Sequence, residues 1–150
     1  MYLADAMDHA IQCLKATNNP CNIIYNKKSP PIAGVPDGLD LVYAFSVFSH
    51  LSEDYFLDWI AYFLKLLKPG GHIVFITRGW QFIEHLQALR ESRGKLPANM
   101  VEYVERLVHE VPTPVRIARN YSEGRFQWYT MDWGVEFTSD FWGESFIPKQ

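Results

Sequence analysis

The sequence predicts an α/β fold with a doubly wound, mostly parallel sheet flanked by helices, and two observations carry that prediction. From residue 1 to about residue 92, strand-like apolar runs alternate with helix-like amphipathic segments, an order typical of such sheets. Residues 39–45 form a nearly continuous apolar run that only Asp40 interrupts. Strands covered on both faces of a parallel sheet have this pattern.

Length and composition exclude several classes of protein. The chain has 150 residues, of which 48% are hydrophobic and 15% aromatic, enough for one packed domain and unlike a disordered chain. The formal net charge is −3, whereas proteins that bind nucleic acids usually carry a basic surface, so no nucleic-acid partner is expected. No apolar run is long enough to span a membrane and no secretory pattern is present, so we expect no membrane partner and a cytoplasmic location.

The first elements are short. Residues 1–5 read as a strand that ends at Asp5, and the segment that follows to Thr17 carries apolar residues at helical spacing. A turn cluster precedes the apolar run 21–25, a second strand. A loop rich in Pro and Gly then leads to the strand over residues 39–45.

The next helix is predicted over residues 52–67. Ser52 is a favoured N-cap residue, two acids follow it in the first turn, and an apolar stripe continues behind them. Residues 68–71, KPGG, are a stop signal. Residues 72–77 then read as a further buried strand and residues 80–92 as a helix.

The last third departs from the alternation. A helical stripe in residues 97–110 predicts an insertion or cover near 95–112, either a lid over a pocket or a packing helix. The region 124–150 is rich in aromatic and β-branched residues, which favours extended segments or a hairpin. No internal repeat or long linker occurs, so a single domain is expected over residues 1–150.

Two strand ends carry side chains suited to a nucleoside. Ligands of open parallel sheets bind at the carboxyl ends of the strands. Ala44, Phe45 and Ser46 offer a small side chain, an aromatic face and a hydroxyl at the end of one strand. Asp5 ends an earlier strand, and a carboxylate there can accept hydrogen bonds from both hydroxyls of a ribose. These residues favour an adenosyl group as the ligand.

Residues 36–79 resemble the class I S-adenosylmethionine-dependent methyltransferases, whose fold is Rossmann-like. LDLVYAFSVFSHL is similar to the fourth-strand motif of that family, and LLKPGGHIVFIT is similar to its turn into the fifth strand. The two motifs lie at the separation that the family shows. The resemblance implies S-adenosylmethionine as cofactor and methyl transfer to an acceptor, for which we expect a small or glycan-like molecule.

The same resemblance implies roles for individual residues. Asp5 would hold the cofactor ribose, Asn26 would flank the adenine, and residues 44–46 would line the cofactor pocket. His50 would face the substrate as the catalytic base. A base of this kind serves a hydroxyl or amine acceptor, whereas a carbon or carboxylate acceptor needs none.

The chain departs from the family in one serious respect. It lacks the glycine-rich loop that follows the family's first strand, and its own first strand corresponds to the family's second. The family's first strand is central, so the sheet is expected to be incomplete at the N-terminus. The C-terminus also ends before the family's final antiparallel pair, which predicts a second incomplete edge.

Each candidate has a structural alternative. Asp5 could cap the following helix, Asn26 could be an ordinary turn residue, and His50 could be a packed histidine. Arg78 and Trp80 follow the strand predicted over residues 72–77, at the edge of the sheet where the ligand is expected. They would bind an acidic or sugar-like substrate there. The structural alternative is a surface arginine and a core tryptophan.

Other functions receive less support. The five histidines show no metal-ligand spacing, and neither a nucleophile elbow nor a phosphate-binding loop occurs. The missing glycine-rich loop leaves open a methyltransferase-like module that is catalytically inactive and serves in interaction or structure. A dinucleotide-dependent oxidoreductase is a third possibility, for which no nicotinamide site is recognisable.

Overall fold

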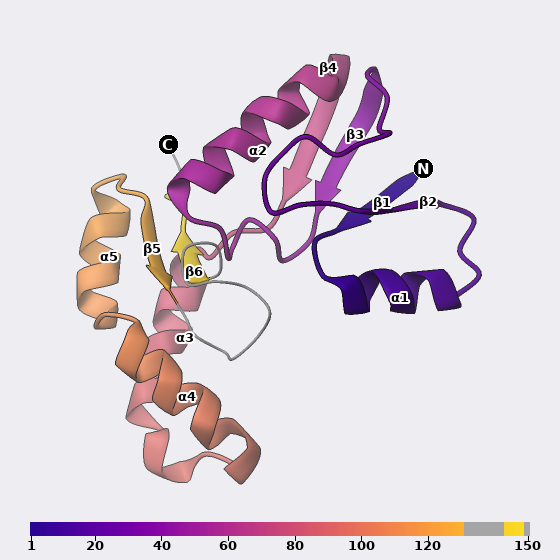
Figure 1. The fold of residues 1–150 in the computed structure, drawn as a ribbon. Coiled ribbons are helices and arrows are strands. Elements are labelled where there is room, and N and C mark those ends of the chain that lie inside the picture. The colour runs from indigo at the N-terminus through magenta and orange to yellow at the C-terminus, as the bar shows by residue number, and fades with distance from the viewer. Residues whose placement is uncertain (131–142, 149–150) are drawn as a thin grey trace. The chain divides into compact units, whose positions relative to one another are not determined.

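The structure, a computed structural model, describes residues 1–130 and 143–148, and its fold is mixed α/β (Figure 1). In the described parts of the chain, no helix combines the length and apolar character needed to cross a membrane. The elements, in order, are β1 (Tyr2–Asp5), α1 (Asp8–Ala16), β2 (Asn22–Tyr25), β3 (Leu39–Ala44), α2 (Glu53–Leu66), β4 (Leu67–Phe75), α3 (Trp80–Glu91), the 3₁₀ turn η1 (Arg93–Lys95), α4 (Ala98–Glu110), α5 (Pro114–Ser122), β5 (Gln127–Thr130) and β6 (Gly143–Phe146).

This order confirms the predicted alternation of strands and helices up to α3. The backbone divides into two compact units, which we describe separately. The first unit comprises Met1–Tyr43 and Tyr55–Val74, and the second comprises Ala44–Asp54 and Phe75–Gln150. One domain can contain both units, so the single domain stays a prediction.

In the first unit, β1 and β2 form a parallel pair joined through α1. Their register runs from Tyr2 opposite Asn22 to Asp5 opposite Tyr25. The pairing extends one residue further, because the Asn26 N–H donates to the Asp5 carbonyl at 3.0 Å. The carboxyl ends of both strands therefore lie together, as expected of a parallel pair.

The second pair, β3 and β4, is connected by α2 and also runs in parallel, with both arrowheads at the same end in Figure 1. Beyond the strands, the Ile76 N–H donates to the Ala44 carbonyl at 3.4 Å. β4 begins at Leu67, directly after α2, so the predicted stop at 68–71 lies inside the strand. A Cβ at Gly71 would lie only 2.9 Å from the Leu39 carbonyl oxygen. The two backbones approach so closely here that glycine is favoured at this position.

The two parallel pairs are separate two-stranded sheets. A continuous doubly wound sheet is therefore not seen among the described strands and stays a prediction. The expectation that residues 39–45 are covered on both faces is wrong, since Leu41, Tyr43 and Phe45 are 54%, 61% and 65% exposed. The apolar run does form a strand, but these side chains are left largely exposed.

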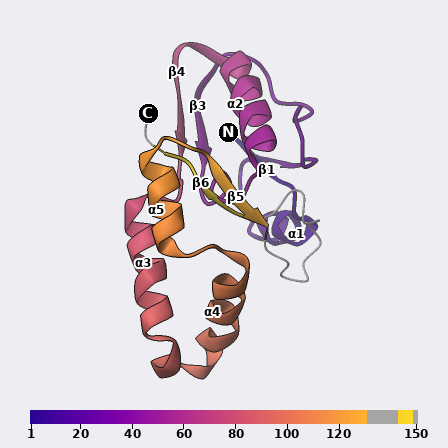
Figure 2. The ribbon, with the colours of Figure 1, turned by 90° about the vertical axis from the view of Figure 1, so that its left-hand side faces the viewer.

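The second unit holds the larger core. Helices α3, α4 and α5 and strand β6 bury one contiguous cluster (Figure 2), made of Ile83, Leu86, Leu89, Val104, Leu107, Val111, Ile117 and Phe146. The helix predicted over 97–110 is confirmed by α4 and packs in this core. Helix α5 was not predicted from the sequence, although Pro114 at its first position is a common start signal.

Strands β5 and β6 pair antiparallel, with Gln127 opposite Phe146 and Thr130 opposite Gly143. They confirm extended structure in two parts of the predicted region 124–150, and the rest of that prediction, at 131–142 and 149–150, lies outside the described residues. A Cβ at Gly143 would lie 2.3 Å from the Tyr129 carbonyl oxygen and 2.7 Å from the Trp128 indole nitrogen. Only glycine fits here without displacement of the backbone.

Candidate functional site

The segment that follows β3 makes an abrupt turn. Ser46 has a φ of +54°, a left-handed conformation that is uncommon for residues other than Gly and costs about 1–2 kcal/mol. The turn then closes with the His50 N–H donating to the Val47 carbonyl at 3.0 Å. Such strain gathers at functional sites, and this turn occurs at the strand end to which the sequence analysis assigned a ligand.

Strand β6 holds this segment by its backbone. The Gly143 N–H donates to the His50 carbonyl at 3.0 Å, and the Ser145 N–H donates to the Ser49 carbonyl at 2.8 Å. The Trp128 indole N–H also donates to the His50 carbonyl, at 3.4 Å. The backbone around His50 is thus anchored by residues far away in the sequence.

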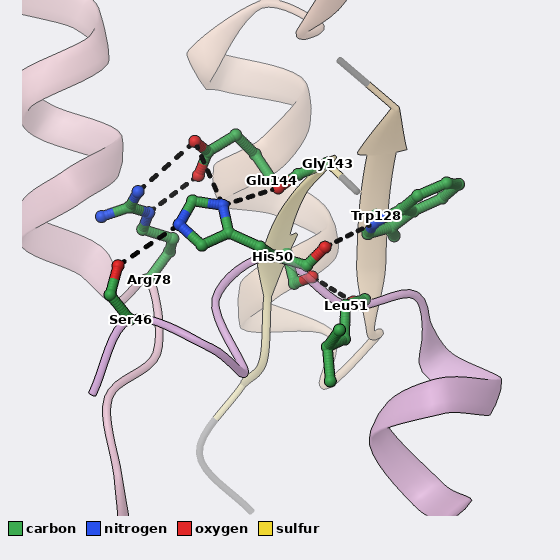
Figure 3. A network of polar contacts seen from close by, with 8 residues as sticks. Ser46, His50, Leu51, Arg78, Trp128, Gly143 and Glu144 are labelled. Carbon is green, nitrogen blue, oxygen red and sulfur yellow. Dashed lines mark hydrogen bonds and ion pairs between the residues drawn. The ribbon is translucent and has the colours of Figure 1, made fainter. Parts of the chain in front are cut away.

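The His50 imidazole has a defined partner on each nitrogen (Figure 3). Nδ1 lies 2.9 Å from the Gly143 carbonyl oxygen and 3.8 Å from Glu144 Oε1. A carbonyl oxygen only accepts hydrogen bonds, so Nδ1 carries the hydrogen and Nε2 keeps its lone pair. Nε2 lies 3.4 Å from Ser46 Oγ, whose hydroxyl can donate to it.

Glu144 and Arg78 form an ion pair on the Nδ1 side of His50. The Arg78 Nε donates to Glu144 Oε2 at 2.8 Å and its Nη2 donates to Oε1 at 3.3 Å. The Glu144 side chain is only 5% exposed, and the Arg78 guanidinium lies 4.2 Å from the centre of the Phe82 ring. A bidentate pair of this kind holds both groups in one orientation.

The surroundings set the charge of His50. Burial lowers the pKa of His50 below its ordinary value of 6.5, and the Arg78 cation acts in the same direction, against the Glu144 carboxylate and the hydrogen bond to Gly143. The net pKa is lowered. At neutral pH the imidazole is therefore uncharged, which leaves Nε2 able to take a proton.

Asp5 and Asn26 lie together in the first unit, at the ends of β1 and β2. Asp5 Oδ1 accepts a hydrogen bond from the Met7 N–H at 2.7 Å, just before α1 begins. Asp5 does not cap α1, because the N-cap position is Met7 and no side chain caps the helix; its bond to the Met7 N–H lies just before that position. A carboxylate has acceptor positions for further donors, so this bond does not compete with the predicted contact to a ribose.

Asn26 shows an unusual feature. Its side-chain N–H donates to the Lys27 carbonyl at 2.8 Å, whereas its Oδ1 is buried and has no hydrogen-bond partner. A buried acceptor without a donor is costly. Because this oxygen is fully enclosed, it cannot meet a ligand as the side chain stands, and the contact of Asn26 with an adenine stays a prediction.

The remaining candidates are placed as follows. Ala44, Phe45 and Ser46 belong to the second unit, and the Phe45 ring is well exposed and able to stack on a base. Arg78 is engaged with Glu144, so its guanidinium already has an acidic partner. Trp80 is 46% exposed and donates to Glu84. The ligand roles of all these residues stay predictions.

Sequence reasoning missed Gly143 and Glu144. Neither belongs to a motif, and the contact of Glu144 with His50 exists only because β6 returns beside the turn after β3. No local signal in the sequence could have revealed this contact. Within residues 1–130 and 143–148, no three His, Cys, Asp or Glu side chains are grouped so that they could hold a metal ion.

A scan of the chain against models of known protein families finds no match. A search of curated protein sequences also finds no match.

Proposed function

We propose that this protein is a methyltransferase that transfers a methyl group from S-adenosylmethionine to a small-molecule or glycan-like acceptor, on a Rossmann-like sheet. The observation that carries the proposal is the uncharged His50 imidazole, with its Nε2 lone pair turned toward the Ser46 hydroxyl at the end of β3. The resemblance of residues 36–79 to class I methyltransferases supports the choice of reaction. The proposed acceptor carries a removable proton, on a hydroxyl or an amine.

The residues would divide the work between binding and proton transfer. When bound, the cofactor supplies an activated methyl group on a sulfonium. Asp5 would accept hydrogen bonds from the ribose hydroxyls of its adenosyl group, and Asn26, at the end of the neighbouring strand in the same unit, would flank the adenine. His50 Nε2 would remove the proton of the acceptor. General-base catalysis of this kind contributes on the order of 10²–10⁴-fold to a rate.

Isothermal titration of the protein with S-adenosylhomocysteine tests the proposal. We expect saturable binding, weakened about tenfold or more in Asp5→Asn, because a hydrogen bond to a charged group contributes about 1.5–3 kcal/mol. Asp8→Asn is the matched control, since Asp8 bonds to Gln12 within α1. Absence of any binding heat from folded protein at high concentration would contradict the proposal.

A second function is favoured by the exposed strands. Leu41 and Tyr43 in β3 and Val74 in β4 are apolar and about half exposed, which is typical of a surface that meets a partner. This observation suits an inactive methyltransferase-like module used in interaction or structure. The same titration separates the two functions, because the inactive module would show normal circular dichroism and no binding of S-adenosylhomocysteine.

A further inference from the structure

We propose that Glu144, held by Arg78, is a positioning residue that keeps the His50 ring oriented with its hydrogen on Nδ1, and that Ser46 passes the acceptor's proton to His50 Nε2. The inference rests on the proposed function and adds three residues to its machinery. Neither Glu144 nor Arg78 touches the acceptor in this scheme. Both act through His50.

The position of Glu144 supports this role. Its carboxylate lies on the Nδ1 side of the imidazole, with Oε1 at 3.8 Å, beside the Gly143 carbonyl at 2.9 Å (Figure 3). Both acceptors favour an N–H at this position over a ring C–H. A flipped imidazole would present a C–H to both acceptors and would lose the hydrogen bond. The ring therefore stays oriented with Nε2 toward Ser46.

Arg78 supplies the second part of the arrangement. Its two bonds to Glu144 use both carboxylate oxygens, so the carboxylate cannot rotate away from His50 without breaking one of them. The Arg78 cation also offsets the negative charge of Glu144. The Glu144–Arg78 pair stabilises the imidazolium that forms when Nε2 takes a proton. Because the Arg78 cation opposes the Glu144 charge, His50 is not already charged before that step.

Ser46 completes the path for the proton. Ser46 is exposed and its backbone has the left-handed conformation. Its Oγ lies 3.4 Å from Nε2 of His50. A hydroxyl can donate one hydrogen bond while it accepts another. The acceptor's proton would move to Ser46 Oγ as the Ser46 proton moves to Nε2. The electron pair left on the acceptor atom forms a new bond to the methyl carbon. The bond between that carbon and the sulfur breaks, and the sulfur keeps its electron pair. The His50 proton then leaves to solvent.

The test is a ¹⁵N–¹H long-range correlation spectrum of the protein without any ligand, recorded across a pH titration. For His50 we expect a protonated Nδ1 and an unprotonated Nε2 at neutral pH. His72, which is exposed, is recorded in the same spectra for comparison. A wild-type spectrum with the hydrogen on Nε2 would overturn the proposal, whatever the variants do.

Two substitutions test the charges around His50, and Glu144→Gln is the one that separates positioning from simple support of the fold. In Glu144→Gln we expect His50 to titrate at lower pH, because the carboxylate that favours its charged form is gone. In Arg78→Gln we expect the titration at higher pH, because an opposing cation is gone. Mere loosening would expose His50 and raise its pKa in both variants. An unchanged or raised titration in folded Glu144→Gln would therefore count against the proposal.

Ser46→Ala tests the proton path and removes only an exposed hydroxyl. We expect the Nε2 resonance to move downfield because the hydrogen bond from Ser46 is lost, with little change in the His50 titration. An unmoved Nε2 resonance would remove Ser46 from the path. Glu102→Gln, in the exposed pair with Arg106, is the control and should leave all His50 signals in place.

These outcomes are independent of cofactor binding. If S-adenosylhomocysteine fails to bind while the His50 spectra behave as described, the methyltransferase function falls and the assignment of Glu144 stands. If the cofactor analogue binds and the spectra contradict the expectations, only the assignment of Glu144, Arg78 and Ser46 falls.

Discussion

The two units treat their apolar residues differently. The second unit buries a contiguous core between three helices and β6. In the first unit, described strands of similar apolar character leave Leu41 and Tyr43 more than half exposed. Hydrophobic burial depends on a second layer that covers the first. An apolar run in the sequence therefore predicts a strand. Whether the side chains of that strand are buried depends on other segments of the chain, which the run does not specify.

The largest expected effect is at the centre of the second unit. Leu107 is 2% exposed, and Leu107→Ala should lower the free energy of unfolding by about 2–5 kcal/mol, because it removes packed methyl groups and leaves a cavity. Leu64→Ala is the matched control in the first unit, where Leu64 is 61% exposed, and should change stability by about 0.5 kcal/mol or less. Urea unfolding measures both. Equal losses would contradict the comparison.

Gly143→Ala should be the next most damaging. The added methyl would meet the Tyr129 carbonyl and the Trp128 ring, so we expect a loss of about 1–3 kcal/mol or more by thermal unfolding. Gly94 has open space around its Cβ position, and Gly94→Ala should stay within about 1 kcal/mol of the wild type. A harmless Gly143→Ala would mean that β6 does not approach β5 this closely.

The buried His50 predicts a dependence of stability on pH. Its pKa in the folded protein is below the ordinary 6.5, so the unfolded chain takes up a proton first as the pH falls. The stability contributed by uncharged His50 is complete above pH 6.5 and declines as the pH falls from there through the folded pKa. Urea unfolding at about pH 7.5 and about pH 5.5 should show this decline in the wild type and in His72→Gln, and a smaller one in His50→Gln. An equal decline in all three proteins would refute it.

The smallest effect is expected at an exposed ion pair of the first unit. Asp40 and Lys68 form a salt bridge with side chains 80% and 52% exposed, and the Lys68 ammonium lowers the pKa of Asp40. Solvent screens such a pair, so Asp40→Asn should leave the urea midpoint at neutral pH unchanged. A clear shift would show that this edge of β3 is more protected than its exposure indicates.

Helices were more predictable than the site. The helices expected over 52–67, 80–92 and 97–110 appear as α2, α3 and α4, because their apolar stripes are local signals. The predicted burial of 39–45 failed because it depends on layers formed by other segments. Of the candidate site, Ser46 was proposed from the strand end and His50 from the resemblance to methyltransferases. Glu144 was not, because tertiary pairing with β6 alone brings it to His50.

The carbonyl of Gly143 has a consequence for how this arrangement can be recognised elsewhere. The group that bonds His50 Nδ1 belongs to the main chain, and every amino acid possesses the same group. A substitution can remove this bond only by moving the backbone, as Gly143→Ala would, and a sequence alignment does not show the bond at all. A search for related imidazole sites must therefore superpose backbones and ask which carbonyl oxygen faces the ring.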